Sequence, residues 1–116
     1  MTVRWGVAGP GPVAGKVMRD LAHVPDAVLT AVGSRLAERA EAFAAAHAAS
    51  AGHRQVPAAH GSYRALLSDP DVDVVYVATP HPHHHALALA ALAARKAVLV
   101  ENQLGMRVIE GPADLP

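Results

Sequence analysis

The chain contains no cysteine and few aromatic residues, which make up 3% of its 116 residues. The lack of cysteine excludes disulfide bonds, thiolate metal sites and a thiol nucleophile. Hydrophobic residues nevertheless make up 52% of the chain, and alanine is the most frequent of them. The core must therefore be built from small side chains, which suits the close packing of helices on a sheet.

Neither sign of charge is in excess, since ten basic and ten acidic side chains give a formal net charge of zero. Nucleic-acid binding and membrane-surface binding both need a basic surface, so we expect neither partner. The longest apolar stretch, Ala86 to Ala94, is too short to span a bilayer. The N-terminus lacks the apolar core of a signal peptide, and we expect a cytoplasmic protein.

Short apolar segments alternate along the chain with segments of helical periodicity. We expect strands at residues 3–8, 28–32, 72–78 and 97–100 and a weak strand around Val56. We expect a helix after every strand except the last one, at residues 97–100. Strand–helix alternation with short connections predicts a parallel sheet. The fold class is therefore α/β: a Rossmann-type three-layer domain over residues 1–103, with a mostly parallel sheet of about five strands. Residues 104–116 keep no periodicity, and we expect an irregular tail.

The first candidate site is the loop Gly9-Pro10-Gly11-Pro12-Val13-Ala14, between the first strand and the first helix. In the G-x-G-x-x-G/A pattern the first glycine makes a tight turn and the second lets a pyrophosphate approach the backbone. The third, small residue seats the helix on the strand, and the helix N-terminus attracts the phosphates. The alternative is a plain glycine turn. We favour a dinucleotide site that uses Gly9, Gly11, Pro12, Val13 and Ala14.

The second candidate site follows the second strand, where NAD-specific proteins usually carry an acidic residue for the ribose hydroxyls. This chain has Ser34-Arg35 there, with Arg39 one turn later in the next helix. A serine hydroxyl and arginines suit the 2′-phosphate of NADP, so we predict NADP as the cofactor, with NAD as the alternative. The other interpretation is that Ser34 caps the helix and Arg35 is a solvated surface charge.

Two further strand ends carry polar residues. After the third long strand the chain reads Ala78-Thr79-Pro80-His81-Pro82-His83-His84-His85, and the last strand ends in Glu101-Asn102-Gln103. His81 and His85 have the spacing of metal ligands on a helix, but no second ligand cluster completes a site, and we expect no metal. Ligands bind at the carboxyl ends of parallel strands. We therefore add Ala78, Thr79, Pro80, His81, His84 and Glu101 to the cofactor candidates.

Together these segments resemble the N-terminal domain of the glucose–fructose oxidoreductase, inositol dehydrogenase and rhizopine-catabolism (Gfo/Idh/MocA) family. The resemblance covers residues 3 to 101 and includes Trp5 to Gly11, Val32 to Arg35, Gly61-Ser62-Tyr63, Asp69 to Val77 and the Thr79-Pro80 segment. The His-Pro-x-His version looks closest to the dimeric dihydrodiol dehydrogenase branch. The resemblance implies an oxidoreductase that transfers a hydride between a nicotinamide cofactor and a hydroxyl of a sugar, cyclitol or diol. It also implies cofactor contacts by Gly9, Gly11, Ala14, Thr79, Pro80, His84 and Glu101.

The chain departs from the family in three ways. Asn102 stands at the position of the family's catalytic lysine and cannot take up or deliver a proton. Arg95 replaces a glycine at the end of a helix, where a left-handed conformation costs a side chain about 1 kcal/mol. The substrate domain and the sixth strand of the sheet are missing.

We therefore expect a truncated or frameshifted chain that is inactive alone; an excised domain or a decayed gene would look the same. The alternative function is a non-catalytic Rossmann module that assembles, as a homo-oligomer, through its exposed sheet edge.

Overall fold

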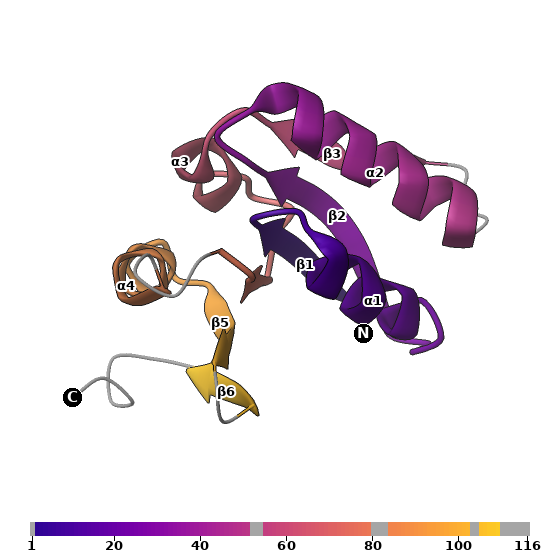
Figure 1. The fold of residues 1–116 in the computed structure, drawn as a ribbon. Coiled ribbons are helices and arrows are strands. Elements are labelled where there is room, and N and C mark those ends of the chain that lie inside the picture. Colours follow the sequence, from indigo (N-terminus) through magenta and orange to yellow (C-terminus); the bar gives the residue numbers. More distant parts are fainter. Residues whose placement is uncertain (1, 52–54, 80–83, 103–104, 110–116) are drawn as a thin grey trace.

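A six-stranded sheet forms the centre of the structure, and helices cover both of its faces (Figure 1). The computed structural model describes residues 2–51, 55–79, 84–102 and 105–109. The strands are β1 (Val3–Ala8), β2 (Ala27–Gly33), β3 (Ala58–His60), β4 (Val74–Val77), β5 (Ala97–Asn102) and β6 (Gly105–Ile109). They lie in the order β3-β2-β1-β4-β5-β6, with β1 to β5 parallel and β6 antiparallel to β5. This order confirms the predicted Rossmann-type α/β fold.

The helices form the two outer layers, as Figure 1 shows. Helices α1 (Pro12–Leu21) and α2 (Ala37–Ala51) pack on one face, and α3 (Tyr63–Leu67) and α4 (His84–Ala93) on the other. Alanines mark the contacts with the sheet, since Ala14, Ala40 and Ala44 are buried beside the α1–α2 face. The small-residue core predicted from composition is thus confirmed. Within the described residues, no helix combines the length and the apolar character that crossing a membrane requires.

The ends of the helices follow local signals in the sequence. Pro12, with its fixed φ and no N–H to leave unpaired, is the first residue of α1. Ser62 caps α3, where its Oγ accepts the N–H of Ala65 at 3.1 Å. After α4, Arg95 has the left-handed φ of 63°. The N–H groups of Arg95 and Lys96 donate to the carbonyls of Leu92 and Ala91, which is the Schellman pattern.

Two expectations about strands are wrong. The third strand starts at Ala58, two residues after Val56, because Pro57 has no N–H to donate to a ladder. Residues 105–109 form β6 instead of an irregular tail, so the sheet has a sixth strand. This strand pairs Asn102 with Gly105 and Val98 with Ile109 through main-chain groups, and such pairing needs no hydrophobic periodicity. Residues 110–116 of the expected tail lie outside the described residues.

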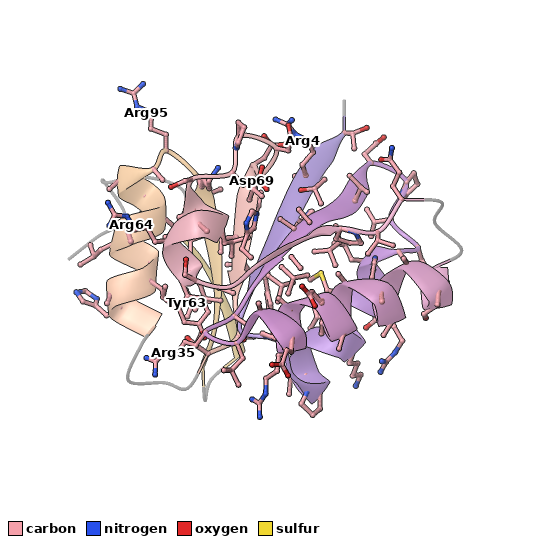
Figure 2. All side chains as sticks on the ribbon, turned by 90° about the horizontal axis from the view of Figure 1, so that it is seen from above. Arg4, Arg35, Tyr63, Arg64, Asp69 and Arg95 are labelled. Carbon is pink, nitrogen blue, oxygen red and sulfur yellow. The ribbon has the colours of Figure 1, made fainter. Side chains whose placement is uncertain are left out.

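An ionic network joins the amino-terminal ends of the strands. The Arg4 guanidinium on β1 lies 3.0 Å from a carboxylate oxygen of Asp73 and 3.3 Å from one of Asp71. The hydrogen bond and charge of Arg4 lower the pKa of Asp73 below its ordinary value. Buried Lys96 donates from Nζ to the main-chain carbonyls of Asp69 and Val72, both at 2.7 Å. Figure 2 shows Arg4 and Asp69 at this end of the sheet and Arg35 at the opposite end.

A further hydrogen bond extends the network to β3. His60 Nε2 lies 2.9 Å from a carboxylate oxygen of Asp69, whose other oxygen accepts the Asp71 N–H at 2.8 Å. Burial acts to raise the pKa of Asp69, but these hydrogen bonds outweigh it and the pKa is lowered. The network therefore fixes the segment between α3 and β4 against β1 and β3.

Candidate dinucleotide-binding site

The turn between β1 and α1 needs a glycine at position 9. Gly9 has a φ of 92°, in the region that side chains rarely adopt, and its N–H donates to the carbonyl of Gly33 at 3.0 Å. A Cβ at this position would lie 2.8 Å from Thr79 Cγ2 and 3.0 Å from Thr79 N. The first glycine of the motif thus makes the tight turn, as predicted, and it also lets the ends of β1 and β4 meet.

Gly11, in contrast, is not required by the rest of the protein. Its φ of −170° belongs to an extended conformation that any residue can adopt. A Cβ at this position would have no other atom within 4 Å. It immediately precedes α1, which has no acidic residue in its first turn and no side-chain cap. The backbone at the positive end of α1 is therefore open to an anion, and this is the cradle that a pyrophosphate needs.

The remaining residues of the motif divide into exposed and buried positions. Pro12 and Val13 are exposed beside Gly11, whereas Ala14 is buried against the sheet. Ala14 therefore seats α1 on the sheet, which is the role that the sequence predicts for the third small residue. Whether Pro12 and Val13 contact a cofactor stays a prediction.

Ser34 and the two arginines differ in what they contact. Ser34 is only 5% exposed, and its Oγ accepts the N–H of Leu36 at 3.2 Å, so it holds the turn into α2. The main-chain N–H of Ser34 donates to the His60 carbonyl at 3.1 Å. Arg35 and Arg39 are exposed, and neither forms an ion pair within the described part of the chain. The local turn role of Ser34 is thus observed, while two cations near the site stay available.

The end of β4 lies directly beside the glycine turn. The Ala78 N–H donates to the Ala8 carbonyl at 2.9 Å, and Thr79 is buried against Gly9. Pro80 and His81 lie outside the described residues. His84 begins α4, and Glu101 and Asn102 end β5, but the side chains of these three lie outside what the structure describes. The backbone therefore brings the ends of β1, β4 and β5 to one edge of the sheet.

A hollow of about 460 Å³ opens next to the glycine turn. It is lined by Pro10, Gly11, Pro12, Arg39, Ala42 and Phe43. Phe43 and Ala42 were not among the residues predicted from the sequence; the signal for Phe43 is its position one turn after Arg39 on α2. Arg39 and the N-terminus of α1 thus line the same hollow.

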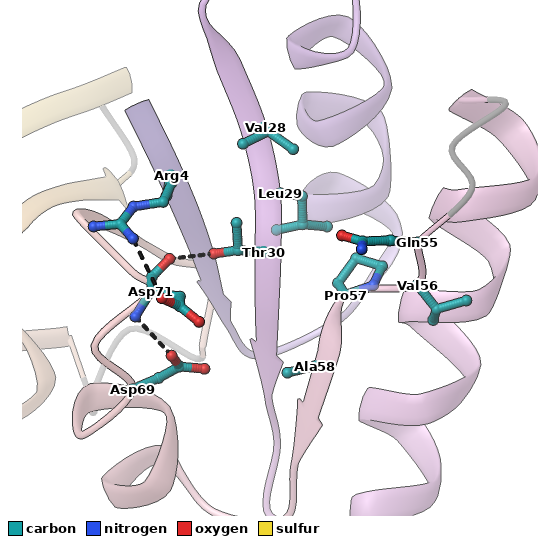
Figure 3. A pocket seen from close by; sticks show the side chains of 10 residues that line it. All are labelled: Arg4, Val28, Leu29, Thr30, Gln55, Val56, Pro57, Ala58, Asp69 and Asp71. Carbon is teal, nitrogen blue, oxygen red and sulfur yellow. Dashed lines mark hydrogen bonds and ion pairs between the residues drawn. The ribbon is translucent and has the colours of Figure 1, made fainter. Parts of the chain in front are cut away.

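A second cavity, of about 470 Å³, lies at the amino-terminal edge of the sheet (Figure 3). Arg4 and Asp71 form its polar side, where the Thr30 hydroxyl donates to the Asp71 carbonyl at 2.7 Å. Since open α/β sheets bind ligands outside the carboxyl ends of their strands, we do not take this cavity as the cofactor site. Among the described residues, no group of three or more His, Asp or Glu side chains could hold a metal ion.

Comparisons with known proteins agree with this geometry. The model of an oxidoreductase family with an NAD-binding Rossmann fold (Gfo/Idh/MocA) matches residues 3–110. Trans-1,2-dihydrobenzene-1,2-diol dehydrogenase of Mus musculus is 38% identical over 112 residues, which are 95% of this chain and 32% of that protein. The chain thus spans about a third of the length of this relative.

Solved structures give the same result. A 3-ketoreductase from Actinomadura kijaniata, in complex with TDP-benzene and NADP, is 32% identical with a TM-score of 0.79, over 90% of this chain and 31% of that one. Myo-inositol dehydrogenase from Lactobacillus casei, in complex with NAD(H) and myo-inositol, is 30% identical with a TM-score of 0.76, over 90% and 30% of the two chains. The chain therefore belongs to the Gfo/Idh/MocA oxidoreductase family, of which it carries the NAD-binding Rossmann domain.

Proposed function

We propose that the chain is the NADP-binding domain of an oxidoreductase that acts on a hydroxyl group of a sugar, cyclitol or diol. The observation that carries the proposal is the open backbone at Gly11, where a Cβ would meet nothing and the positive end of α1 is uncapped. A glycine that the fold does not require is explained by a ligand that approaches the backbone closely.

The preference for NADP over NAD is supported by the residues after β2. Arg35 and Arg39 are exposed without ion-pair partners among the described residues, and no carboxylate occupies the ribose position. The 2′-phosphate carries about two negative charges, which arginine can meet with two parallel hydrogen bonds. A carboxylate at this place would instead favour the free ribose hydroxyls of NAD.

The reaction class follows from the relatives, whose names include a diol dehydrogenase, an inositol dehydrogenase and a ketoreductase. A bound nicotinamide supplies the hydride acceptor or donor for such reactions. The proton of the hydroxyl needs a base, and Asn102, at the family's lysine position, cannot provide one. General acid–base catalysis contributes about 10²–10⁴-fold, so this chain alone is expected to bind cofactor without appreciable turnover.

Calorimetric titration with NADPH and NADH tests the cofactor proposal. NADPH should bind and raise the melting temperature, and Gly11→Val should weaken it at least tenfold because its side chain occupies the phosphate cradle. The melting temperature of Gly11→Val without nucleotide should equal that of the parent chain, since a Cβ at Gly11 finds open space.

The choice of cofactor has its own pair of variants. Arg35→Gln should weaken NADPH at least tenfold and leave NADH nearly unchanged. Arg64→Gln, at an exposed arginine on α3, is the matched control and should change neither. No binding of either nucleotide at millimolar concentration would refute the proposal.

A second candidate function is supported by the edges of the sheet. Strand β6 is the last strand of the order, so one of its sides faces no strand of the described residues. Such edges can pair with another chain, and the chain would then be a non-catalytic assembly module. Light scattering with and without NADP separates the two functions, because an oligomer insensitive to the cofactor favours assembly.

A further inference from the structure

A groove runs between α1 and α2, starting at the glycine turn. Besides the hollow of about 460 Å³ near Arg39, a second hollow of about 370 Å³ lies further along the two helices. The two share Gly11, Pro12 and Phe43, so they adjoin. Each has the volume of a small-molecule pocket. We call this the α1–α2 groove.

The floor of the groove contains a glycine that the fold does not need. Gly15 lies inside α1, where glycine is less favourable than alanine by about 0.5–1 kcal/mol. A Cβ at Gly15 would lie 3.5 Å from Arg19 Nη1 and 3.9 Å from Phe43 Cε2, which are ordinary contacts. Packing between the helices would thus accept an alanine, whereas at Gly33 a Cβ would lie 2.8 Å from Leu66 Cβ. The glycine at position 15 keeps the floor of the groove open.

The walls of the groove are cationic and aromatic. The cations Arg19 and Arg39 line it together with the aromatic Phe43, and no carboxylate does so among the described residues. Arg19 forms no ion pair within that part of the chain. A cation in the last turn of α1 also favours the helix dipole, but the dipole requires neither an aromatic wall nor an open floor. The positions of Gly15, Arg19 and Phe43 together suit a flat, negatively charged occupant.

We propose that the α1–α2 groove binds small aromatic carboxylates. The ring packs against the exposed side of Phe43, next to Gly15, and the carboxylate pairs with the Arg19 guanidinium, which suits bidentate recognition. The other end of the groove reaches Gly11 and Pro12, so an occupied groove competes with the pyrophosphate of the dinucleotide. This competition, unlike the binding itself, rests on the proposed function.

The experiment uses benzene-1,4-dicarboxylate as the probe, with the ¹⁵N-labelled chain in an NMR titration. The probe should shift the amide signals of Gly15, Arg19 and Phe43 and bind with a millimolar or lower Kd. Arg19→Gln should weaken it at least tenfold, and Gly15→Leu should abolish binding by filling the floor. Lys16→Gln is the matched control, since Lys16 is an exposed cation on α1 outside the groove lining, and it should bind like the parent.

Benzene-1,4-dicarboxamide, which has the same shape without charge, should bind at least tenfold more weakly than the dicarboxylate. Absence of probe binding, shifts confined to other parts of the chain, or equal affinity of Arg19→Gln and the parent would overturn the site. Thermal melts of Gly15→Leu and Arg19→Gln test whether these variants are still folded. If Gly15→Leu does not fold, Gly15→Ala replaces it; its smaller side chain should keep the fold and still weaken binding of the probe.

The competition is measured separately by adding NADPH to the complex. NADPH should raise the apparent Kd of the probe in proportion to its own occupancy. Simultaneous binding of both would overturn the competition. If the probe binds and NADPH does not, the proposed function is refuted and the proposed probe site is supported. If NADPH binds and the probe does not, the probe site is refuted and the proposed cofactor site is unaffected.

Discussion

At the scale of single residues, the glycines at positions 9, 11 and 15 differ in their surroundings. Gly9 is fixed by its φ of 92° and by Thr79, whereas a Cβ at Gly11 or at Gly15 would meet no obstacle closer than 3.5 Å. The G-x-G-x-x-A pattern predicts that Gly9 and Gly11 matter. It does not separate a glycine required by the fold from one left open for a ligand, because that difference depends on Thr79, which is 70 residues further along the chain.

Arg95 carries a strained backbone that a glycine would relieve. Its φ of 63° costs a side chain about 1 kcal/mol, so Arg95→Gly should raise the free energy of unfolding by about that amount. The control is Ala90→Gly, at an exposed position within α4, which should lower it by about 1 kcal/mol. Urea denaturation measures both. A loss of stability in Arg95→Gly would show that the arginine side chain makes a compensating contact.

At the scale of elements, Lys96 joins the start of β5 to the segment between α3 and β4. Its Nζ donates to two carbonyls at 2.7 Å, one of Asp69 and one of Val72, and the side chain is buried. Lys96→Met keeps the apolar stem but leaves both carbonyls without this donor. The Asp69 carbonyl still accepts the Val72 N–H, so we expect a loss of about 1–3 kcal/mol in the free energy of unfolding, which is the cost of one unsatisfied buried group.

Lys16→Met is the control for Lys96, because Lys16 is exposed on α1 and forms no ion pair within the described residues. Its effect should stay within about 0.5 kcal/mol. Equal melting temperatures of the two variants would contradict the structural role of Lys96.

The pairing of Arg4 with Asp73 makes the contact between β1 and the start of β4 sensitive to acid. Because the hydrogen bond with Arg4 lowers the pKa of Asp73 in the folded chain, the pair stabilises the fold above the unfolded pKa of about 4. That stability is lost as the pH falls through the lower, folded pKa. Asp73→Asn should therefore be less stable than the parent at pH 7, and the difference should shrink below about pH 4. Urea midpoints from pH 2 to 7 measure this; a constant difference would contradict it.

The elements that sequence could predict are those with local signals. Pro12 at the start of α1, Ser62 before α3 and the β-branched run of β4 each act within a few residues, and the structure confirms all three elements. The network at the amino-terminal edge could not be predicted, since Arg4 and Asp73 are 69 residues apart in sequence. The role of Ser34 was also only half predictable, because its hydroxyl binds the backbone of Leu36 within the turn.

At the scale of the whole molecule, the sheet combines an order typical of nucleotide-binding domains with an antiparallel strand at one edge. Strands β1 to β5 bring the glycine turn and the ends of β4 and β5 to one side. Strand β6 adds no residue of the predicted site, but it gives β5 a main-chain partner on its outer side. We therefore expect β6 to contribute to the stability of the fold and to its association state more than to cofactor binding.

Removal of β6 tests this expectation. In a chain of residues 1–103, the apolar segment Val98 to Val100 becomes the edge of the sheet, and exposed edges of β-branched residues pair with other chains. We expect a lower melting temperature and concentration-dependent association in light scattering. A chain of residues 1–110 keeps β6 and is the control. If β6 is itself the assembly surface, the control associates and the shorter chain does not. If the shorter chain is monomeric and its melting temperature is unchanged, β6 neither stabilises the fold nor protects the edge of β5 from association.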